Sequence, residues 1–245
     1  MTDHIQALLL SVERTLMLKK NISKTPPTPK TPLVAVDALI LTVQEGKLVV
    51  LLTEIGFGPY KSQWALPGGL VRMEESIDEA AERVLLEKAG VDGIYLEQLA
   101  TFGAVNRDKR ERSVAVAYFA LVNNDSCRPK VTEYSTDIRW YPVKKLPLLA
   151  FDHAAVIKLG VERLRNKLGY TNIAYALLSR EFTLSELQQV YEIILGRALD
   201  KRNFRKKIQA IGIVKGSGKK RHQGVSRPAQ LFTFTERKPK VADIL

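Results

Sequence analysis

The sequence predicts an α/β fold followed by a C-terminal winged helix-turn-helix unit. Strand-like runs precede and follow one well-marked helix over residues 76–89, and two capped helices with a basic hairpin occupy residues 183–234. All of the excess positive charge lies in the C-terminal part. A length of 245 residues is enough for two compact domains. Because no apolar run approaches the ~18 residues that cross a bilayer, we exclude a membrane-spanning protein.

The charge is divided unevenly along the chain. Lys and Arg number 38 and Asp and Glu 26, which gives a net charge of +12. Residues 1–152 hold 19 basic and 19 acidic side chains, whereas residues 153–245 hold 19 and 7. This partition indicates a neutral module, residues 33–152, joined to a module that binds a polyanion, residues 153–245. The single cysteine, Cys127, excludes an intrachain disulfide and a thiolate metal cluster and suits a reducing cytoplasm.

Residues 1–32 form a separate N-terminal segment in this prediction. Apolar side chains recur at spacings of three and four over residues 1–20, which is typical of an amphipathic helix. Residues 21–32 carry four prolines and no apolar periodicity, so they indicate a semi-extended linker. Two interpretations of the helix stay open: it closes the core of its own domain, or it is an arm that packs on a second subunit.

The neutral module begins with a β-hairpin. Apolar strand-like residues from Leu33 onward are interrupted by Glu45-Gly46-Lys47 and then resume, which is typical of two strands joined by a tight turn. The helix over residues 76–89 follows. Further strand-like runs lie near residues 94–103, 113–122 and 137–141.

The most specific segment runs from Trp64 to Val91, where a glycine turn leads into an acidic helix. Seven residues fall in register with the pattern Gly-x5-Glu-x7-Arg-Glu-apolar-x-Glu-Glu-x-Gly-apolar: Gly69, Glu75, Arg83, Leu85, Glu87, Gly90 and Val91. The segment resembles a Nudix box, and the resemblance implies a Nudix-like α/β/α sandwich with a mixed sheet. In such a segment the acidic helix face gathers divalent cations that neutralise a diphosphate and orient the attacking water.

Two of the three glutamates that the Nudix family uses for metal are replaced here. Val84 cannot ligate a cation, and the ammonium group of Lys88 repels one, so only Glu87 of that trio is left. We therefore expect no efficient Mg²⁺-dependent hydrolysis and no metal site. The other acids of this region, Glu74, Glu75, Glu79 and Glu82, are interpreted as a solvated face, with an alternative metal site as the second interpretation. The resemblance implies that Arg83 and Glu75 hold the loop on the helix.

A basic loop precedes the strand-like run at residues 113–122, and this region resembles the ADP-ribose-handling branch of the Nudix family. The resemblance implies that Arg107, and less strongly Arg110 and Arg112, meet a diphosphate by forked hydrogen bonds. It also implies that Phe102 or Tyr118 lies against a ring of the ligand. Glu75 and Glu87 are counted with them as predicted ligand-binding residues. The alternative interpretation is an exposed, charged hairpin tip.

The C-terminal module contains two helices with clear start signals. Thr183-Leu-Ser-Glu186 is a capping box that begins a helix ending at Gly196, and Asp200 caps a second helix over residues 201–211. The sequence then continues as Ile213-Val214, a glycine-rich basic loop over residues 215–224 and a strand over residues 230–234. Residues 153–178 have helical spacing that is broken near Gly169.

The second helix is predicted to read DNA from its polar face, opposite Phe204 and Ile208. Arginine or lysine can bond guanine and glutamine can bond adenine, while the hairpin contacts phosphate or the minor groove. Nine basic residues against one acid over residues 200–221 argue against an ordinary solvated helix. The predicted DNA-binding residues are Lys201, Arg202, Arg205, Lys206, Gln209, Lys219, Lys220 and Arg221.

The three histidines have no metal-ligand spacing, and His153 is interpreted as a capping or hinge residue where the modules join. The combination of a damaged Nudix box and a basic winged helix is similar to the NrtR family of transcriptional regulators. That resemblance implies a cytoplasmic, homodimeric repressor of NAD biosynthesis or salvage genes that needs no cofactor, binds a palindromic operator in double-stranded DNA and is released by ADP-ribose. Two alternatives stay open: an active Nudix hydrolase with a nucleic-acid-binding appendage, and a related repressor induced by a sugar.

Overall fold

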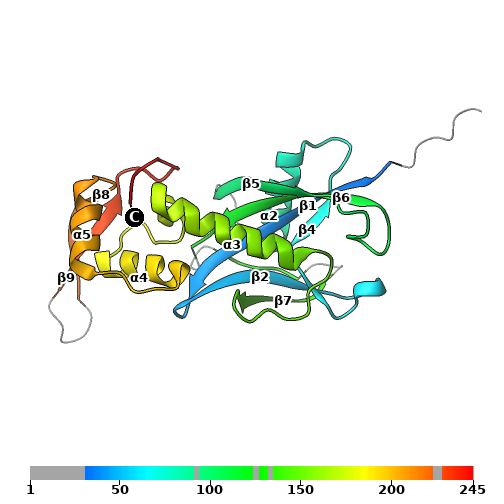
Figure 1. Ribbon diagram of the computed structural model, residues 1–245, viewed down its shortest axis with the longest axis horizontal. Coiled ribbons are helices and arrows are strands. Elements are labelled where there is room, and N and C mark those ends of the chain that lie inside the picture. The colour runs from blue at the N-terminus through cyan, green and yellow to red at the C-terminus, as the bar shows by residue number, and fades with distance from the viewer. Residues whose placement is uncertain (1–30, 91–93, 124–126, 132–134, 223–227, 245) are drawn as a thin grey trace, which may run out of the picture. The chain divides into compact units, whose positions relative to one another are not determined.

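The computed structural model describes residues 31–90, 94–123, 127–131, 135–222 and 228–244 (Figure 1). The predicted N-terminal amphipathic helix and almost all of the predicted linker lie outside the described residues. Within them, no helix is long and apolar enough to cross a membrane.

The first part of the chain folds as a mixed β-sheet with the predicted hairpin at its centre. Strand β1 pairs in parallel with β6 and antiparallel with β2 and β4, while β2 pairs antiparallel with β3 and β7, and β5 pairs antiparallel with β6. The predicted strands near residues 94–103, 113–122 and 137–141 are confirmed as β5, β6 and β7. The strands are β1 (Leu33–Gln44), β2 (Lys47–Ile55), β3 (Trp64–Ala65), β4 (Gly68–Leu70), β5 (Tyr95–Phe102), β6 (Ser113–Leu121) and β7 (Ser135–Pro142).

Helices cover both faces of this sheet, because β1 is apolar on both sides. Val36, Ala38 and Ile40 pack toward helix α2 (Ile77–Ala89), whereas Leu39 and Leu41 belong to the core that includes helix α3 (His153–Tyr170). At Gly160 the backbone of α3 comes so close to Leu39 that a Cβ atom would lie 1.9 Å from the leucine Cδ2. The result is the predicted α/β/α sandwich, with α3 as its second helical layer.

Helix α2 has well-defined ends. Ser76 and Glu79 form a reciprocal capping box at its N-terminus, and the helix ends at Gly90, whose φ of 66° is in the left-handed region. A Cβ atom on Gly90 would lie 2.6 Å from the carbonyl oxygen of Arg128, so both the conformation and the space require glycine.

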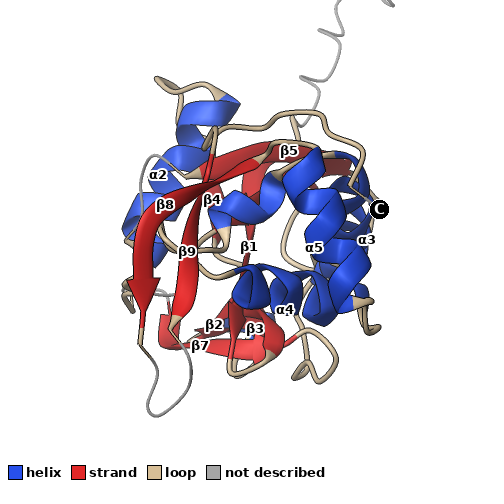
Figure 2. Ribbon diagram, turned by 90° about the vertical axis from the view of Figure 1, so that its left-hand side faces the viewer, coloured by secondary structure: helices blue, strands red, loops and turns tan. Residues whose placement is uncertain are grey.

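The C-terminal part is a winged helix-turn-helix. Both predicted starts are confirmed, by the Thr183–Glu186 capping box and by Asp200, whose side chain accepts from the amide of Asn203. Helix α5 contacts strand β8, and β8 pairs antiparallel with strand β9 (Figure 2). The elements are the 3₁₀ turn η3 (Ile173–Ala176), the helices α4 (Leu184–Leu195) and α5 (Lys201–Ala210), and the strands β8 (Val214–Arg221) and β9 (Ala229–Phe234).

The prediction of a glycine-rich loop beginning at residue 215 was wrong for residues 215–221, which form most of β8. Pairing with β9 orders these residues, and the register shifts between Gly216 and Lys220. Gly218 lies within that irregularity with a φ of 79°, so glycine here serves a bulge in the strand.

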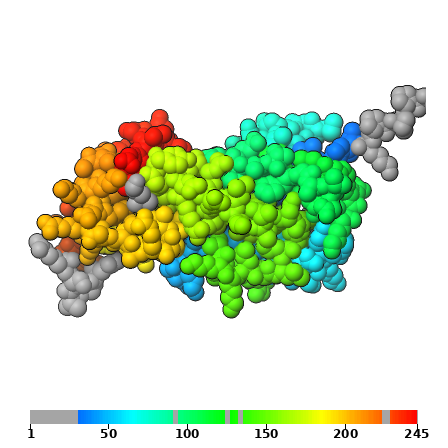
Figure 3. All heavy atoms as spheres, viewed as in Figure 1, coloured from blue at the N-terminus to red at the C-terminus, as the bar shows by residue number. Residues whose placement is uncertain are grey.

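The two parts share one hydrophobic core across α3. Val156, Ile157 and Leu164 of α3 belong to the same cluster of buried residues as Leu39 of the sheet and Tyr191 of α4. The space-filling view shows the atoms of α3 continuous with those of α4 (Figure 3). The domain boundary that we placed between residues 152 and 153 stays a prediction, because α3 packs against both the sheet and the winged helix.

We predict that Gly90→Ala lowers the free energy of unfolding by about 2 kcal/mol, because an alanine would be held in the left-handed region against a backbone carbonyl. Gly169→Ala is the matched control. Gly169 lies in α3, and no atom lies within 4 Å of the place that a Cβ atom would take, so this change should stabilise the protein by about 0.5–1 kcal/mol. Urea unfolding of both variants measures the difference; equal effects of the two substitutions would contradict the assignment.

Candidate functional site

The glycine loop of the Nudix-like segment is held on α2 by a bidentate ion pair. Arg83 donates from Nε to Glu75 Oε2 at 2.8 Å and from Nη2 to Glu75 Oε1 at 2.6 Å, and Nη2 also donates to the Leu70 carbonyl at 3.0 Å. The backbone amide of Arg72 donates to the same carboxylate at 2.8 Å. This geometry matches the structural role predicted for Arg83 and Glu75. The hydrogen bonds from Arg83 lower the pKa of Glu75 to about 2 from its ordinary 4.5.

Glu87, the remaining member of the metal-binding trio, faces two arginines. Its carboxylate lies 3.4 Å from Arg83 Nη1 and 3.4 Å from Arg72 Nη2. Val84 is fully buried in the core beneath α2. Among the described residues, no group of three His, Cys, Asp or Glu side chains is placed to hold a metal ion. The donor set is one carboxylate already neutralised by guanidinium groups, and it does not fit a divalent cation.

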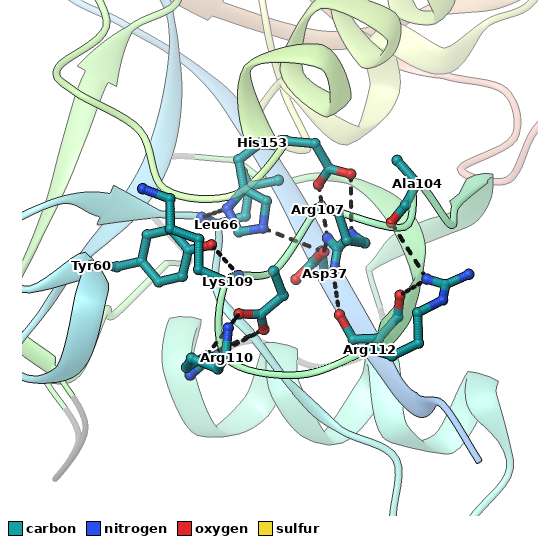
Figure 4. A network of polar contacts seen from close by, with 12 residues as sticks. Asp37, Tyr60, Leu66, Ala104, Arg107, Lys109, Arg110, Arg112 and His153 are labelled. Carbon is teal, nitrogen blue, oxygen red and sulfur yellow. Dashed lines mark hydrogen bonds and ion pairs between the residues drawn. The ribbon is translucent and has the colours of Figure 1, made fainter. Parts of the chain in front are cut away.

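The basic loop between β5 and β6 is fixed by Arg107, whose side chain is buried and so does not fit the alternative interpretation of an exposed hairpin tip (Figure 4). Its side chain is 4% exposed. It donates to Asp152 from Nε at 3.0 Å and from Nη2 at 2.8 Å, to Asp37 Oδ2 at 3.1 Å and to Ser113 Oγ at 3.3 Å. A direct contact with a ligand stays a prediction, and it would require these ion pairs to break.

His153 completes the cluster around Asp37. Its Nδ1 accepts a hydrogen bond from the amide of Leu66 at 2.9 Å, and its Nε2 lies 3.4 Å from Asp37 Oδ2. Burial works against ionisation of Asp37, but His153 and Arg107 outweigh it and hold the pKa of this carboxyl below its usual value. His153 is thus a buried residue at the start of α3, at the join where we predicted a capping or hinge role.

The other two arginines of the loop also have partners within the protein. Arg110 pairs with Asp108 at 2.8 Å, and its guanidinium carbon lies 5.1 Å from the centre of the Phe151 ring. Arg112 donates to the backbone carbonyls of Gly103 at 3.0 Å and of Ser113 at 2.7 Å. Arg110 and Arg112 are both exposed, whereas Arg107 is buried.

The two predicted aromatic contacts lie on different sides of the sheet. Phe102 is partly buried against the core that contains α3. Tyr118 is buried on the α2 side, 3% exposed, and its hydroxyl hydrogen-bonds to Asp78. The structure therefore does not bring these rings together, and Tyr118 has little surface to offer to a ligand.

Residues that the sequence analysis did not assign to the site also gather here. The hydroxyl of Tyr60 accepts from the amide of Lys109 at 2.8 Å, and the Tyr60 ring lies 4.4 Å from that of Phe151. Arg72, Asp37 and Asp152 are further residues that pair with predicted site residues: Arg72 with Glu87, and Asp37 and Asp152 with Arg107. The sequence did not predict these contacts, because the two members of each pair are far apart in the chain and come together only in the folded protein.

The predicted DNA-binding residues of α5 occupy one exposed face. Phe204 and Ile208 are buried on the opposite side. A shallow hollow of about 520 Å³ is lined by all five of the predicted helix residues, Lys201, Arg202, Arg205, Lys206 and Gln209. Arg205 also donates to Ser185 Oγ at 2.8 Å, which anchors one of these cations to α4.

Strands β8 and β9 form the wing of the winged helix. Two of its three predicted DNA-binding residues make ion pairs within the winged helix. Lys219 lies 3.1 Å from Glu181, and Arg221 lies 2.6 Å from Glu186, the acidic member of the capping box. Arg221 also donates to the Glu181 carbonyl at 3.1 Å. Lys220 is exposed. The two pairs hold β8 on the N-terminal end of α4, so Lys219 and Arg221 position the wing whether or not they also touch DNA.

A Nudix-type sandwich with a Glu75–Arg83 loop clamp and an attached basic winged helix defines a class of DNA-binding proteins with a small-molecule domain. Residues 31–160 match the model of the NUDIX domain, and residues 174–234 match that of the NrtR DNA-binding winged helix domain. The chain belongs to the NrtR family of Nudix-domain regulators.

Three relatives illustrate the likeness. The ADPR responsive transcriptional repressor NtrR of Acinetobacter baylyi is 42% identical over 208 residues, which cover 83% of this chain and 82% of that protein. NrtR of Shewanella oneidensis is 36% identical. Its complex with a 27mer DNA has a TM-score of 0.73 and covers 82% of this chain and 93% of that one; its NUDIX domain with ADP ribose has a TM-score of 0.51 and covers 60% and 97%. The ADP-ribose pyrophosphatase of Methanocaldococcus jannaschii is 30% identical over 52% of this chain and 72% of that protein.

We predict that Glu75→Gln makes the protein less stable at pH 6 and that this deficit shrinks as the pH falls from about 4.5 toward 2. Because the pKa of Glu75 is lowered in the folded protein, its stabilising ionisation is fully present above 4.5 and is lost as the pH falls through this range. Urea unfolding at a series of pH values measures the deficit. Glu74→Gln, an exposed carboxylate of the same loop, is the matched control; a deficit for Glu75→Gln that does not change with pH would contradict the prediction.

Proposed function

We propose that this protein is a transcriptional repressor that binds operator DNA through its winged helix and is released by ADP-ribose bound to its Nudix domain. The observation that carries the proposal is the exposed face of α5, where four cations and one amide line a single hollow on a domain of the NrtR winged-helix family. The names of the Acinetobacter and Shewanella relatives support both halves of the proposal. Genes of NAD biosynthesis or salvage are the proposed targets.

DNA recognition is assigned to α5 in the major groove. Arg202, Arg205 and Lys206 can donate to guanine, and Gln209 can form a bidentate contact with adenine, while Lys201 and Lys220 are the proposed phosphate contacts. A homodimer would present two such helices to the half-sites of a palindromic operator, about 34 Å apart. The repression is then sensitive to any change in the spacing of the two helices.

The effector site is assigned to the surface around the Nudix segment and the basic loop. Arg110 is the proposed diphosphate contact and Phe102 the proposed ring contact, with Glu75 and Glu87 shaping the site through Arg83 and Arg72. The predicted contacts of Arg107 and Tyr118 are kept only as secondary proposals, because both side chains are buried.

Hydrolysis is not part of the proposed function. Val84 contributes an apolar side chain to the core and Lys88 a positive charge, where the family's metal-dependent members use glutamates, and Glu87 is neutralised by two arginines. Without a bound cation, the attacking water lacks activation and the diphosphate lacks charge compensation. ADP-ribose is thereby bound and not consumed, which suits an effector.

The decisive measurement is the affinity of the full-length protein for a palindromic duplex, selected by this protein from a random-sequence pool, with and without ADP-ribose. We expect the affinity to fall by about two orders of magnitude at saturating ADP-ribose, which corresponds to about 2.7 kcal/mol of differential binding. Lys206→Ala should weaken DNA binding and reduce its dependence on salt while leaving ADP-ribose affinity intact, and Lys158→Ala on α3 is the matched control. An unchanged affinity at saturating effector contradicts the proposal.

The same protein separates the two alternatives. AMP release from ADP-ribose with Mg²⁺ or Mn²⁺ at a robust turnover would favour a hydrolase with a nucleic-acid-binding appendage. A rise of the unfolding temperature with arabinose and not with ADP-ribose would favour a sugar-induced repressor, because a ligand stabilises the fold that binds it.

A further inference from the structure

Arg107 lies at a point where three separate parts of the chain meet. Its guanidinium group joins Asp37 on β1, Ser113 at the start of β6 and Asp152 at the start of α3. The side chains of Arg107 and Asp37 are 4% and 10% exposed, and that of Asp152 is 20% exposed. Buried charges of this kind are costly to separate, so the three parts are held in one arrangement while the ion pairs last. We call Asp37, Arg107, Asp152 and His153 the junction cluster; Figure 4 labels Asp37, Arg107 and His153 of this cluster.

One side of the junction cluster touches the Nudix segment. His153 accepts the amide of Leu66, and Asp37 lies opposite Gly68, where a Cβ atom would be 2.6 Å from the Asp37 carboxylate. The chain continues from Gly68 into the loop that Arg83 clamps to Glu75. A ligand that moves this loop therefore acts on atoms that touch Asp37 and His153.

A second side touches the basic loop. Arg107 belongs to this loop, and Arg110 lies over Phe151, the residue before Asp152. The ring of Phe151 also lies 5.0 Å from that of His153. A diphosphate that draws Arg110 away from Phe151 changes the packing at the same junction.

The third side of the junction cluster is the start of α3, where Asp152 binds Arg107 and does not cap its own helix. Asp152 occupies the N-cap position of α3, yet its carboxylate accepts no hydrogen bond from the first turn and is turned to Arg107. An aspartate at this position ordinarily accepts from a free amide of the helix and stabilises it. Phe151 precedes it with a φ of 54°, in the left-handed region that a phenylalanine rarely adopts. The backbone turn into α3 is thus strained and is fixed from outside the helix.

Helix α3 extends from this turn to the DNA-binding part. Arg165 donates from Nε to the carbonyl of Ile194, near the C-terminal end of α4, at 3.0 Å. The buried residues of α3 share one core with α4, and Tyr191 of α4 packs on Phe204 of α5. A small change in how α3 begins is therefore passed to α5 through packed elements.

We propose that Asp152 and Arg107 are positioning residues that couple the effector site to α5, and that the coupling depends on the ion pair between them. The inference rests on the proposed function. Effector binding at the Nudix segment or at the basic loop shifts the junction cluster, and the Arg107–Asp152 pair converts that shift into a movement of α3. Cutting this pair should leave both binding sites intact and separate them from each other.

The test uses three measurements on the full-length protein: ADP-ribose affinity by calorimetry, affinity for the selected palindromic duplex alone, and affinity for that duplex at saturating ADP-ribose. In Asp152→Ala, Arg107 keeps its contact with Asp37. We expect both affinities measured with a single ligand to stay within about two-fold of the wild type, and the effect of ADP-ribose on DNA affinity to fall by about ten-fold. Asp152→Glu restores the carboxylate and should restore most of the effect.

Asp137→Ala is the matched control, since it removes a carboxylate paired with Arg139 on β7 of the same domain. It should behave as the wild type. If Asp152→Ala does not fold, Asp152→Asn, which has the same size, makes the same test. A responsive wild type together with a variant that responds equally overturns the inference alone. A wild type whose DNA affinity ignores ADP-ribose contradicts the proposed function and the inference with it.

Discussion

The region where β1, β6 and α3 meet depends on the burial of one guanidinium group, that of Arg107. A charge taken out of water costs several kcal/mol, and the cost is offset only where geometry and hydrogen bonding are good. Arg107 meets this condition with two carboxylates and a hydroxyl, which come from β1, the start of α3 and β6. Because Asp37 would otherwise be a buried acid with His153 as its remaining partner, the strand, the loop and the helix depend on this arginine to share the region.

Ion pairs within the protein also redistribute the charge that the composition reports. In the Nudix segment, Arg72 and Arg83 neutralise the carboxylate that a metal ion would use. In the wing, Lys219 and Arg221 are paired with Glu181 and Glu186. Among the described residues, four cations of α5 line one hollow, and Lys220 of β8 is also exposed. Positive charge on a helix face and on the neighbouring hairpin suits a groove of DNA better than a flat, extended anionic surface.

Local signals in the sequence predicted the elements well, whereas the contacts of the site were beyond them. The Thr183–Glu186 capping box, the Asp200 cap and the buried face of α5 arise from residues three or four apart, and such patterns can be recognised in a single sequence. Arg107 meets Asp37 at a separation of 70 residues and Asp152 at 45, so nothing local distinguishes it from an exposed loop arginine. The burial of Tyr118 could not be predicted for another reason. Strand β6 is buried on both faces, so its apolar run does not show which side chain points to which helix.

The position of α3 explains why the α/β/α sandwich and the winged helix pack against each other and are not separate domains on a linker. Its buried side chains enter the core of the sheet and the core of the winged helix together, and Glu97 of β5 pairs with Arg163 and Lys167 along its length. A helix so anchored cannot swing freely, but packed helices can slide by small steps. The position of α3 is determined at the start of the helix. There Phe151 has a strained backbone conformation, and the Asp152 side chain binds Arg107 and does not cap the helix. Strain that persists in a fold requires surroundings that enforce it, and here the enforcing contacts are the polar, directional hydrogen bonds between Arg107 and Asp152.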